Sequence, residues 1–339
     1  MLRVRPIQAS DKDDFFELAE LSGLGFTSLP NDPELLQSRI HFSEESFAKA
    51  IEEPGEEGYL LVLEDMTSGK VAGTSAVKVG IGISRPFFSY KLFSISQVSP
   101  STKGRFDMEL MILVNEYAGA TEVGTLFVRP EFRGGGRGSL IARARYLLMA
   151  TELKRFSRNV LSELRGVFHE DGTCPFYEHL AKKFIHMDFA EADHLSSITD
   201  QQFILDLMPK YPIYVDLLPE EAQAVIGKTH HEGVGARRLL ENEGFRYERV
   251  IDIFDGGPTM SAPIDSLLTV KRSQTLQIKA GKAGSVRGLI SNERFEKFRA
   301  CAGMVAPVHE DGILVVEPQI LDALEVIEGD TIRFIENET

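Results

Sequence analysis

Several features that would define other classes of protein are missing from this sequence. It contains no tryptophan and only two cysteines, Cys174 and Cys301. Two cysteines cannot form a disulfide framework, and neither they nor the histidines have metal-ligand spacing, so we expect reduced thiols and no metal. No apolar run approaches the roughly 18 residues of a membrane span, and the first residues lack the apolar stretch of a secretory signal. These absences predict a soluble, cytoplasmic protein that does not enter a membrane.

Positive charge is also scarce. The chain has 37 Lys and Arg against 51 Asp and Glu, a net charge of −14. An acidic surface repels phosphate, which disfavours a nucleic-acid-binding protein. An apolar content of 43% and a charged content of 26% are ordinary for a folded globular chain and exclude a disordered one. At 339 residues, about two domains are expected.

Hydrophobic periodicity divides the first two thirds of the chain into short elements. Strands are expected at residues 2–8, 59–65, 71–81, 125–128 and 159–167. Helices are expected after Asp11, at 34–53, at 139–156 and from Pro175, whereas residues 82–124 show no clear pattern. This order predicts a mixed α/β sheet with a crossover helix.

The last third of the chain has a different character. A helix, a phenylalanine and a strand follow one another in the patterns of residues 177–189 and 236–254, which indicates either a degenerate second copy or two ordinary units. Residues 271–339 predict a small β-rich module, with a hairpin at Asp311-Gly312 and a strand, turn and strand over 324–335. We therefore expect domains at 1–200, 201–270 and 271–339.

A glycine-rich turn is the most informative segment. Gly134, Gly135, Gly136 and Gly138 follow a short strand and precede a helix. Glycines permit positive φ and let a ligand approach the backbone, and the N-terminus of a helix attracts anions. Five arginines stand between 129 and 145 against one acid, Glu131, which predicts a phosphate-rich ligand. The alternative is a plain β–α turn with surface arginines.

The spacing of the glycines restricts which class of phosphate-containing ligand the turn can bind. Neither the dinucleotide pattern nor the P-loop pattern fits, because no glycine stands at 139 or 141 and no Gly-Lys-Ser/Thr closes the turn. The pattern R-x-x-G-x-G, with Arg133, Gly136 and Gly138, resembles the pyrophosphate-binding segment of the GCN5-related N-acyltransferases, which use coenzyme A thioesters. The resemblance implies a mixed-sheet fold of that kind, with Leu126 beside the acyl group. It implies these cofactor-binding residues: Leu126, Phe127, Val128, Arg133, Gly134, Gly135, Gly136, Arg137, Gly138 and Ser139.

A narrower resemblance extends over nearly the whole chain. The segments GFTSLP, TLFVRPEFR, ELRGV, MPKYPIY, AQAVIGKTH and EGFRYERVIDIFDGGPT are similar to those of the arginine N-succinyltransferases. The resemblance implies transfer of succinyl from succinyl-CoA to the α-amine of L-arginine, without a prosthetic group. In some relatives ornithine is also an acceptor and two similar subunits assemble, so we expect a homo-oligomer or a hetero-oligomer.

The same resemblance supplies candidate catalytic residues. The segment Ile226–His230 matches a family pattern in which the histidine is taken as the proton donor, whereas the alternative for His230 is to cap the following helix. Tyr177 is a second candidate acid or a packing residue. Glu163 is a candidate general base or guanidinium partner, or forms a structural ion pair with Arg165.

Acidic and hydroxyl side chains are the candidates for binding the acceptor. Carboxylates pair well with a guanidinium, so Asp252 and Asp255 are acceptor-binding candidates, with capping of a turn as the alternative for Asp255. Thr27 and Ser28 lie in the loop that covers the acceptor in this superfamily, or they cap a helix. Arg85 and Arg165 are candidates for binding the succinyl carboxylate.

Two rival hypotheses remain. One is an acyltransferase with another amine acceptor or an acetyl donor. The other takes residues 271–339 as a DNA-binding module, but its nine cations and eleven acids leave no basic stripe.

Overall fold

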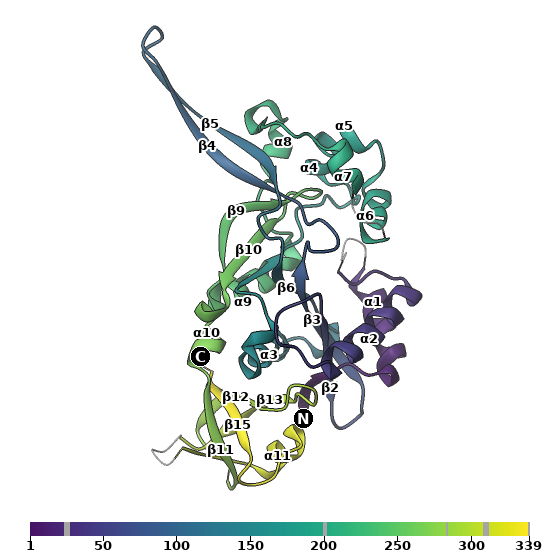
Figure 1. Cartoon of the computed structure of the whole chain (residues 1–339), viewed down its shortest axis with the longest axis vertical. Coiled ribbons are helices and arrows are strands. Elements are labelled where there is room, and N and C mark those ends of the chain that lie inside the picture. Colours follow the sequence, from purple (N-terminus) through teal and green to yellow (C-terminus); the bar gives the residue numbers. More distant parts are fainter. Residues whose placement is uncertain (24–27, 199–201, 283, 308–311, 338–339) are drawn as a thin grey trace. The chain divides into compact units, whose positions relative to one another are not determined.

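The computed structural model describes residues 1–23, 28–198, 202–282, 284–307 and 312–337. The chain forms two compact units. Figure 1 labels its helices and strands. Unit 1 contains Met1–Val79, Thr121–Arg158 and Pro263–Thr339, and unit 2 contains Gly80–Ala120 and Asn159–Ala262. Each unit has its own hydrophobic core and is described by itself.

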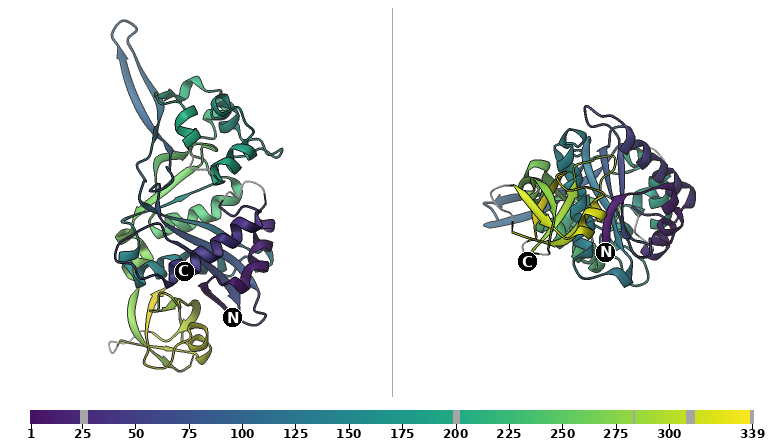
Figure 2. Two further views of the ribbon diagram at one scale, coloured as in Figure 1. Left: turned by 45° about the vertical axis from the view of Figure 1, so that its right-hand side comes forward. Right: turned by 90° about the horizontal axis from the view of Figure 1, so that it is seen from below.

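Unit 1 is built on a sheet whose strands run in the order β1, β2, β3 and β6. Two helices, α1 and α2, lie side by side along one face of these strands (Figure 2). The elements of this part are β1 (Leu2–Pro6), α1 (Lys12–Ser22), α2 (Pro33–Ala48), β2 (Gly58–Asp65), β3 (Val71–Ile81), β6 (Ala120–Val128), α3 (Arg137–Thr151) and α10 (Leu268–Arg272), with 3₁₀ turns at Ala9–Asp11, Pro130–Phe132, Leu153–Arg155 and Ile264–Ser266.

The alternation of side chains in β2 separates two layers of core. Leu60 and Val62 pack with the apolar stripes of α1 and α2 in one cluster, whereas the intervening Leu61 belongs to the opposite face of the strand. Helix α2 begins at a defined cap, because the Asp32 carboxylate accepts the backbone N–H of Leu35 and Pro33 occupies the first turn. Nine residues of α3 are buried, so this helix is fixed on most of its sides.

The C-terminal part of unit 1 is a small closed barrel. Its strands follow the order β12, β15, β11, β14 and β13, and pairing of β12 with β13 closes the ring. The barrel elements are β11 (Gln274–Ala280), β12 (Val286–Asn292), β13 (Ala300–Val305), β14 (Ile313–Val316), α11 (Pro318–Leu324) and β15 (Thr331–Glu336). Strand β13 also pairs with β1, so the barrel continues the main sheet of unit 1.

Unit 2 combines a second set of strands with short helices. Its elements are β4 (Ser89–Ser99), β5 (Gly104–Val114), β7 (Asn159–Glu163), α4 (Pro175–His179), α5 (Lys182–Ile185), α6 (Phe189–Ile198), α7 (Gln202–Leu207), β8 (Ile213–Tyr214), α8 (Glu220–Gln223), α9 (Val234–Glu243), β9 (Arg246–Asp252) and β10 (Pro258–Pro263), with 3₁₀ turns at Val215–Leu217 and His231–Gly233. The strand order is β7, β10, β9, β4, β5 and β8. The core of the unit is formed between these strands and α4 to α7.

Strands β4 and β5 form a long hairpin within unit 2 (Figure 1). They pair continuously from Ser89 opposite Val114 to Ser99 opposite Gly104. Strand β9 pairs only with residues 89–91 of β4, and β8 pairs only with residues 110–111 of β5. The distal part of the hairpin is therefore a two-stranded ribbon.

The mixed α/β class and the β-rich C-terminal module are confirmed, but several predicted elements are wrong. Residues 82–124 contain β4, β5 and the start of β6. The predicted helix from Pro175 is interrupted at Leu180, and residues 186–188 connect two helices instead of forming a strand, so the first half of the suspected internal repeat contains no strand. Helix α2 ends at Ala48 instead of residue 53. Of the predicted strand, turn and strand over 324–335, only the second strand forms, because α11 ends at Leu324 and residues 325–330 form a turn.

No helix in the described part of the chain combines the length and the apolar character needed to cross a membrane. Within the same residues, no three His, Cys, Asp or Glu side chains come together in a way that could hold a metal ion.

Candidate functional site

The glycine turn adopts the conformation that its sequence predicts. Gly134, Gly135 and Gly136 have φ of 90°, 61° and 81°, in the left-handed region that favours glycine, and all three are exposed. The turn joins β6 to α3, which begins at Arg137. The N–H of Arg137 donates to the carbonyl of Gly134 at 3.2 Å, whereas no hydrogen bond among the described residues involves the N–H groups of Gly138 and Ser139. These two groups in the first turn of α3 are therefore available to a ligand. The prediction of a strand, a glycine turn and a helix is confirmed.

Gly138 differs from the other three glycines. It lies in the first turn of α3, its φ is not in the left-handed region, and a Cβ atom built on it meets nothing within 4 Å. Neither the backbone conformation nor any neighbouring described atom therefore requires a glycine at this position. A ligand that approaches the backbone closely is a physical reason for the missing side chain.

The five arginines around the turn are not equivalent, because three of them have partners elsewhere in the fold. Arg129 is fully buried and pairs with Asp14 and Glu17 at 3.1 and 2.8 Å. Arg143 donates hydrogen bonds to Thr269 and Asn337, and Arg145 is buried and donates to the carbonyl of Ala142. These three side chains stabilise the fold instead.

Two arginines remain at the turn itself. The Nε of Arg133 donates to the carbonyl of Val128 at 3.0 Å, and its guanidinium lies over the ring of Phe127. Arg137 lies over the ring of Phe132, with 5.9 Å between the guanidinium carbon and the ring centre. Both contacts hold a positive charge close to the exposed glycines.

A third cation reaches the turn from the C-terminal barrel. Arg287 of β12 donates from Nη2 to the carbonyl of Gly135 at 3.0 Å. Since the C=O and N–H of a trans peptide point in opposite directions, this bond turns the N–H of Gly136 away from the barrel. Sequence reasoning missed Arg287, because nothing local relates it to a turn 152 residues earlier.

Strand β6 carries a backbone irregularity just before Leu126. Thr125 has φ of 52°, which is unusual for a β-branched residue and disrupts the regular extended strand. Its hydroxyl donates to the carbonyl of Ser28 at 3.2 Å, and Nη1 of Arg39 donates to the same carbonyl at 2.8 Å. The structure thus brings Ser28 to β6 in unit 1, whereas Thr27 lies outside the described residues.

Three segments that were distinctive in the sequence meet in unit 2. The N–H of Gly227 donates to the carbonyl of Gly256 at 2.8 Å, and the N–H of His230 donates to the carbonyl of Arg165 at 2.8 Å. A Cβ on Gly166 would lie 2.2 Å from the carbonyl oxygen of Asp255. The segments ELRGV, IGKTH and DGGP therefore pack through their backbones, which requires glycine.

His230 is held in a defined orientation. Its side chain is only 7% exposed, and Nδ1 accepts the N–H of Glu232 at 3.3 Å, so a neutral ring carries its proton on Nε2. Burial lowers the pKa of His230, with Arg165 and His231 adding to this effect and Glu232 opposing it. The bond from the Glu232 N–H to Nδ1 is the one expected if His230 caps the following helix. It leaves Nε2–H of His230 as the available donor.

The two aspartates of DIFDGGP accept backbone hydrogen bonds. Asp255 is buried, and its two carboxylate oxygens accept the N–H groups of Gly166 and Gly257, each at 2.7 Å. Asp252 accepts the N–H groups of Phe254 and Asp255 at 2.7 and 2.8 Å. Burial raises the pKa of both carboxyls, and for Asp255 the charge of Asp252 raises it further. These bonds are those of the turn-capping alternative.

The remaining catalytic candidates differ in their surroundings. Tyr177 is fully buried, packs edge-to-face on Phe189 and donates its hydroxyl to the carbonyl of Met187 at 3.1 Å. Burial raises the pKa of Tyr177 to about 12. These are the contacts of the packing alternative. Glu163 is half-buried and forms the last residue of β7.

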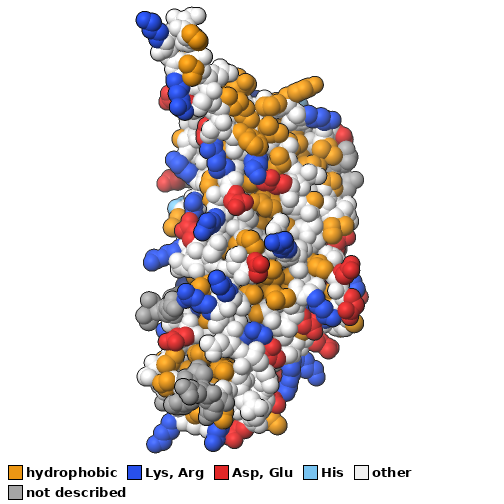
Figure 3. Space-filling model, turned by 60° about the vertical axis from the view of Figure 1, so that its left-hand side comes forward, with side chains coloured by type: hydrophobic (Ala, Val, Ile, Leu, Met, Phe, Trp, Pro, Cys, Tyr) orange, Lys and Arg blue, Asp and Glu red, His pale blue; other side chains and the backbone are white. Residues whose placement is uncertain are grey.

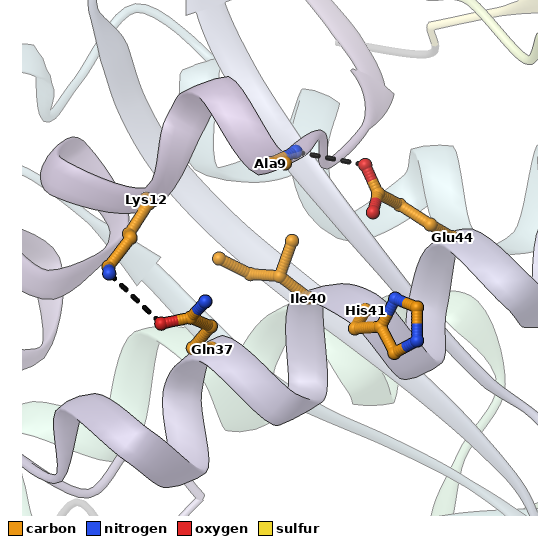
Figure 4. Close-up of a pocket in the computed structure, with 6 residues that line it drawn as sticks. All are labelled: Ala9, Lys12, Gln37, Ile40, His41 and Glu44. Atoms are coloured by element: carbon orange, nitrogen blue, oxygen red, sulfur yellow. Dashed lines mark hydrogen bonds between the residues drawn. The ribbon is translucent and has the colours of Figure 1, made fainter.

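A surface pocket of about 170 Å³ lies apart from these residues, between α2 and the start of α1 (Figure 4). Its lining includes Lys12, which donates to Gln37 at 2.9 Å, and Glu44, which accepts the N–H of Ala9 at 2.9 Å. Since its polar groups bond to one another, the pocket is not the candidate site.

Comparisons with known proteins show the family of the chain. A family model described as the arginine N-succinyltransferase beta subunit matches residues 2–269, and one described as the C-terminal domain of that subunit matches residues 268–336. The arginine N-succinyltransferases of Enterobacter sp. (strain 638) and Escherichia coli (strain 55989 / EAEC) are each 36% identical over 338 residues, which cover 99% of this chain and 97% of each relative. The solved structure of arginine/ornithine succinyltransferase subunit AI from Pseudomonas aeruginosa is 32% identical, has a TM-score of 0.91 and is covered to 99%, with 100% of this chain matched. The chain belongs to the arginine N-succinyltransferase family.

Proposed function

We propose that this protein transfers a succinyl group from succinyl-CoA to the α-amine of L-arginine. The observation that carries this proposal is the exposed glycine turn, with Arg133 and Arg137 beside it, in a chain that matches this family over its full length. A diphosphate can accept hydrogen bonds from the turn and from the first N–H groups of α3. Strand β6 supports the pantetheine arm in the same proposal, with Leu126, Phe127 and Val128 along it and Ser139 at the start of α3.

The reaction needs no covalent intermediate on the protein. The amine nitrogen bonds to the thioester carbon, the carbon–sulfur bond breaks, and the proton lost by the amine ends on the thiolate. His230 is our candidate proton donor, because a neutral ring with its proton on Nε2 can donate to the departing sulfur. Glu163 is our candidate base for the amine.

On the acceptor side, Thr27 and Ser28 are our candidate binding residues. Asp252 and Asp255 are second candidates for the acceptor guanidinium, behind Thr27 and Ser28, because their carboxylates also accept backbone N–H groups. Ornithine is a second candidate acceptor, since the Pseudomonas aeruginosa relative carries ornithine in its description.

We also propose that the protein is cytoplasmic and that two copies associate. Both cysteines are free and buried, which suits a reducing compartment. One face of the ribbon of β4 and β5 carries Phe93, Ile95, Met108 and Phe106, together with the polar Gln97 opposite Phe106. Leu110, opposite Phe93, is buried. Phe93 and Phe106 are 40% and 52% exposed, and Figure 3 shows hydrophobic side chains on this hairpin at the top of the view. Within residues 92–110 the charges balance, because Lys103 and Arg105 stand against Asp107 and Glu109, so two such faces can meet without repulsion in an otherwise acidic molecule.

The direct test is release of free thiol when the purified protein is mixed with succinyl-CoA and L-arginine. Acetyl-CoA tests the alternative donor and ornithine tests the alternative acceptor. We expect the highest kcat/KM for the succinyl-CoA and arginine pair. No thiol release with any of these pairs would contradict the proposed function.

A further inference from the structure

Arg39 of unit 1 is anchored beside strand β6. It lies in α2, and its Nη1 donates to the carbonyl of Ser28 at 2.8 Å. The hydroxyl of Thr125 donates to the same carbonyl at 3.2 Å. Arg39 is therefore fixed beside the irregular part of β6, next to the residue that precedes Leu126.

The charge of Arg39 is not matched by a carboxylate in contact with it. Among the residues that the structure describes, its hydrogen bond is to a neutral carbonyl and no ion pair involves it. Residues 24–27, which precede Ser28 in the chain, include no acidic side chain. A half-buried guanidinium with only a neutral partner is costly, and an anionic ligand would offset this cost.

Two carboxylates, those of Glu122 and Asp32, interact electrostatically with Arg39, but each is bonded to another group. Glu122 pairs with Lys78 at 3.2 Å, and Asp32 accepts the N–H of Leu35 at the start of α2. Burial lowers the pKa of Arg39, and these two carboxylates offset that effect only in part. Both acids act from beyond ion-pair distance.

Both substrates of the proposed reaction carry a carboxylate. The succinyl group ends in one, and L-arginine has its α-carboxylate. A guanidinium presents a planar fork that fits a carboxylate through two parallel hydrogen bonds. We propose that Arg39 binds a substrate carboxylate beside Leu126, an inference that rests on the proposed function.

The alternative is that Arg39 only tethers the Ser28 segment to α2. Arg39→Gln removes the charge and keeps an N–H donor at the position of Nε, and the comparison of substrates with and without a carboxylate separates the two roles. Arg39→Lys keeps the charge and removes the fork. Arg294→Gln removes an exposed arginine of the C-terminal barrel that also donates to a carbonyl, that of Glu325, and is the matched control, with unchanged kinetics expected.

The test compares kcat/KM of each variant with the unsubstituted protein for four substrate pairs. Donors are succinyl-CoA and butyryl-CoA, which has the same chain length without the carboxylate. Acceptors are arginine and agmatine, its decarboxylated analogue. For Arg39→Gln we expect kcat/KM to fall by about 100-fold in two of the four pairs, namely the two that share the carboxylate bound by Arg39. For Arg39→Lys we expect a smaller fall in the same two pairs.

The pattern of losses assigns the carboxylate. A loss with both succinyl-CoA pairs and neither butyryl-CoA pair assigns Arg39 to the donor, and a loss with both arginine pairs and neither agmatine pair assigns it to the acceptor. An equal fall of kcat/KM in all four pairs, with or without a lower melting temperature, would overturn the inference and would indicate that Arg39 only tethers the Ser28 segment to α2. No fall in any pair would also overturn the inference. Activity of the unsubstituted protein is measured first, so failure of the proposed function is seen separately.

Discussion

Replacing Gly138 with alanine distinguishes an effect on stability from an effect on binding of coenzyme A. A Cβ at Gly138 meets nothing within 4 Å, and the backbone there is ordinary helix. Exchanging a helical glycine for alanine stabilises a helix by about 0.5–1 kcal/mol. In a chain of 339 residues that gain raises the melting temperature by about 1 °C.

The same substitution should weaken binding of coenzyme A. If the diphosphate lies against the backbone of the turn, a methyl group at Gly138 displaces it and weakens one or two charge-assisted hydrogen bonds. The expected cost is about 2–3 kcal/mol, or a Kd raised roughly 30- to 150-fold, and Gly138→Val should abolish binding. Calorimetric titration with coenzyme A measures this change.

Gly235 offers a matched control. It lies in the first turn of α9, and a Cβ there also meets nothing within 4 Å. Gly235→Ala should raise the melting temperature to a similar extent and leave the Kd unchanged. Gly136→Ala is less informative, because φ of 81° and the guanidinium of Arg287 at 3.2 Å make it destabilising in itself. Wild-type affinity in both Gly138 variants would refute the placement of the diphosphate at this turn.

Three further predictions concern other parts of the molecule. His230→Gln should lower kcat and leave the Kd for coenzyme A unchanged; equal turnover would remove His230 from the mechanism. Because burial lowers the pKa of His230, the unfolded chain binds a proton that the folded chain does not, so the free energy of unfolding should fall as the pH drops below about 6.5, and His230→Gln should flatten that decline in urea titrations. Arg287→Ala should raise the Kd for coenzyme A about 10-fold with kcat unchanged, whereas Lys279→Ala, which removes an exposed charge from the same barrel, should not; equal effects would exclude a positioning role for Arg287. Phe106→Asp should convert a dimer to a monomer in sedimentation velocity, whereas Val98→Asp on the opposite face should not, and a monomeric unsubstituted protein would contradict the assembly.

Local patterns in the sequence predicted those parts that depend on neighbouring residues. The hairpin of β2 and β3 followed from alternation around a short polar turn. The conformation of Gly134 to Gly136 followed from the absence of side chains, and the start of α3 followed from the pattern after the turn. In each case the physical cause lies within a few residues along the chain.

Patterns failed where burial or distant contacts decide the outcome. The β4–β5 ribbon was missed because its apolar face is exposed instead of packed into a core, so its alternation lacks a buried run. Helix formation from Pro175 stopped at Leu180, where the chain packs into the core of unit 2. For Asp252 and Asp255 the sequence left binding of the acceptor and capping of a turn as alternatives, and only the folded chain shows which backbone N–H groups their carboxylates accept.

By itself, the sequence determined that this chain contains a glycine turn before a helix, and it determined the family to which the chain belongs. Tertiary structure alone decided which cations serve that turn. The charge of Arg129 is neutralised by ion pairs with Asp14 and Glu17. Arg287, from the barrel formed by the C-terminal part of the chain, donates a hydrogen bond to the turn. It also placed Arg39 beside β6 without a carboxylate in contact among the described residues. The reason is physical: the charge that a side chain offers to a ligand depends on the partners that folding brings to it, and those partners can lie anywhere in the sequence.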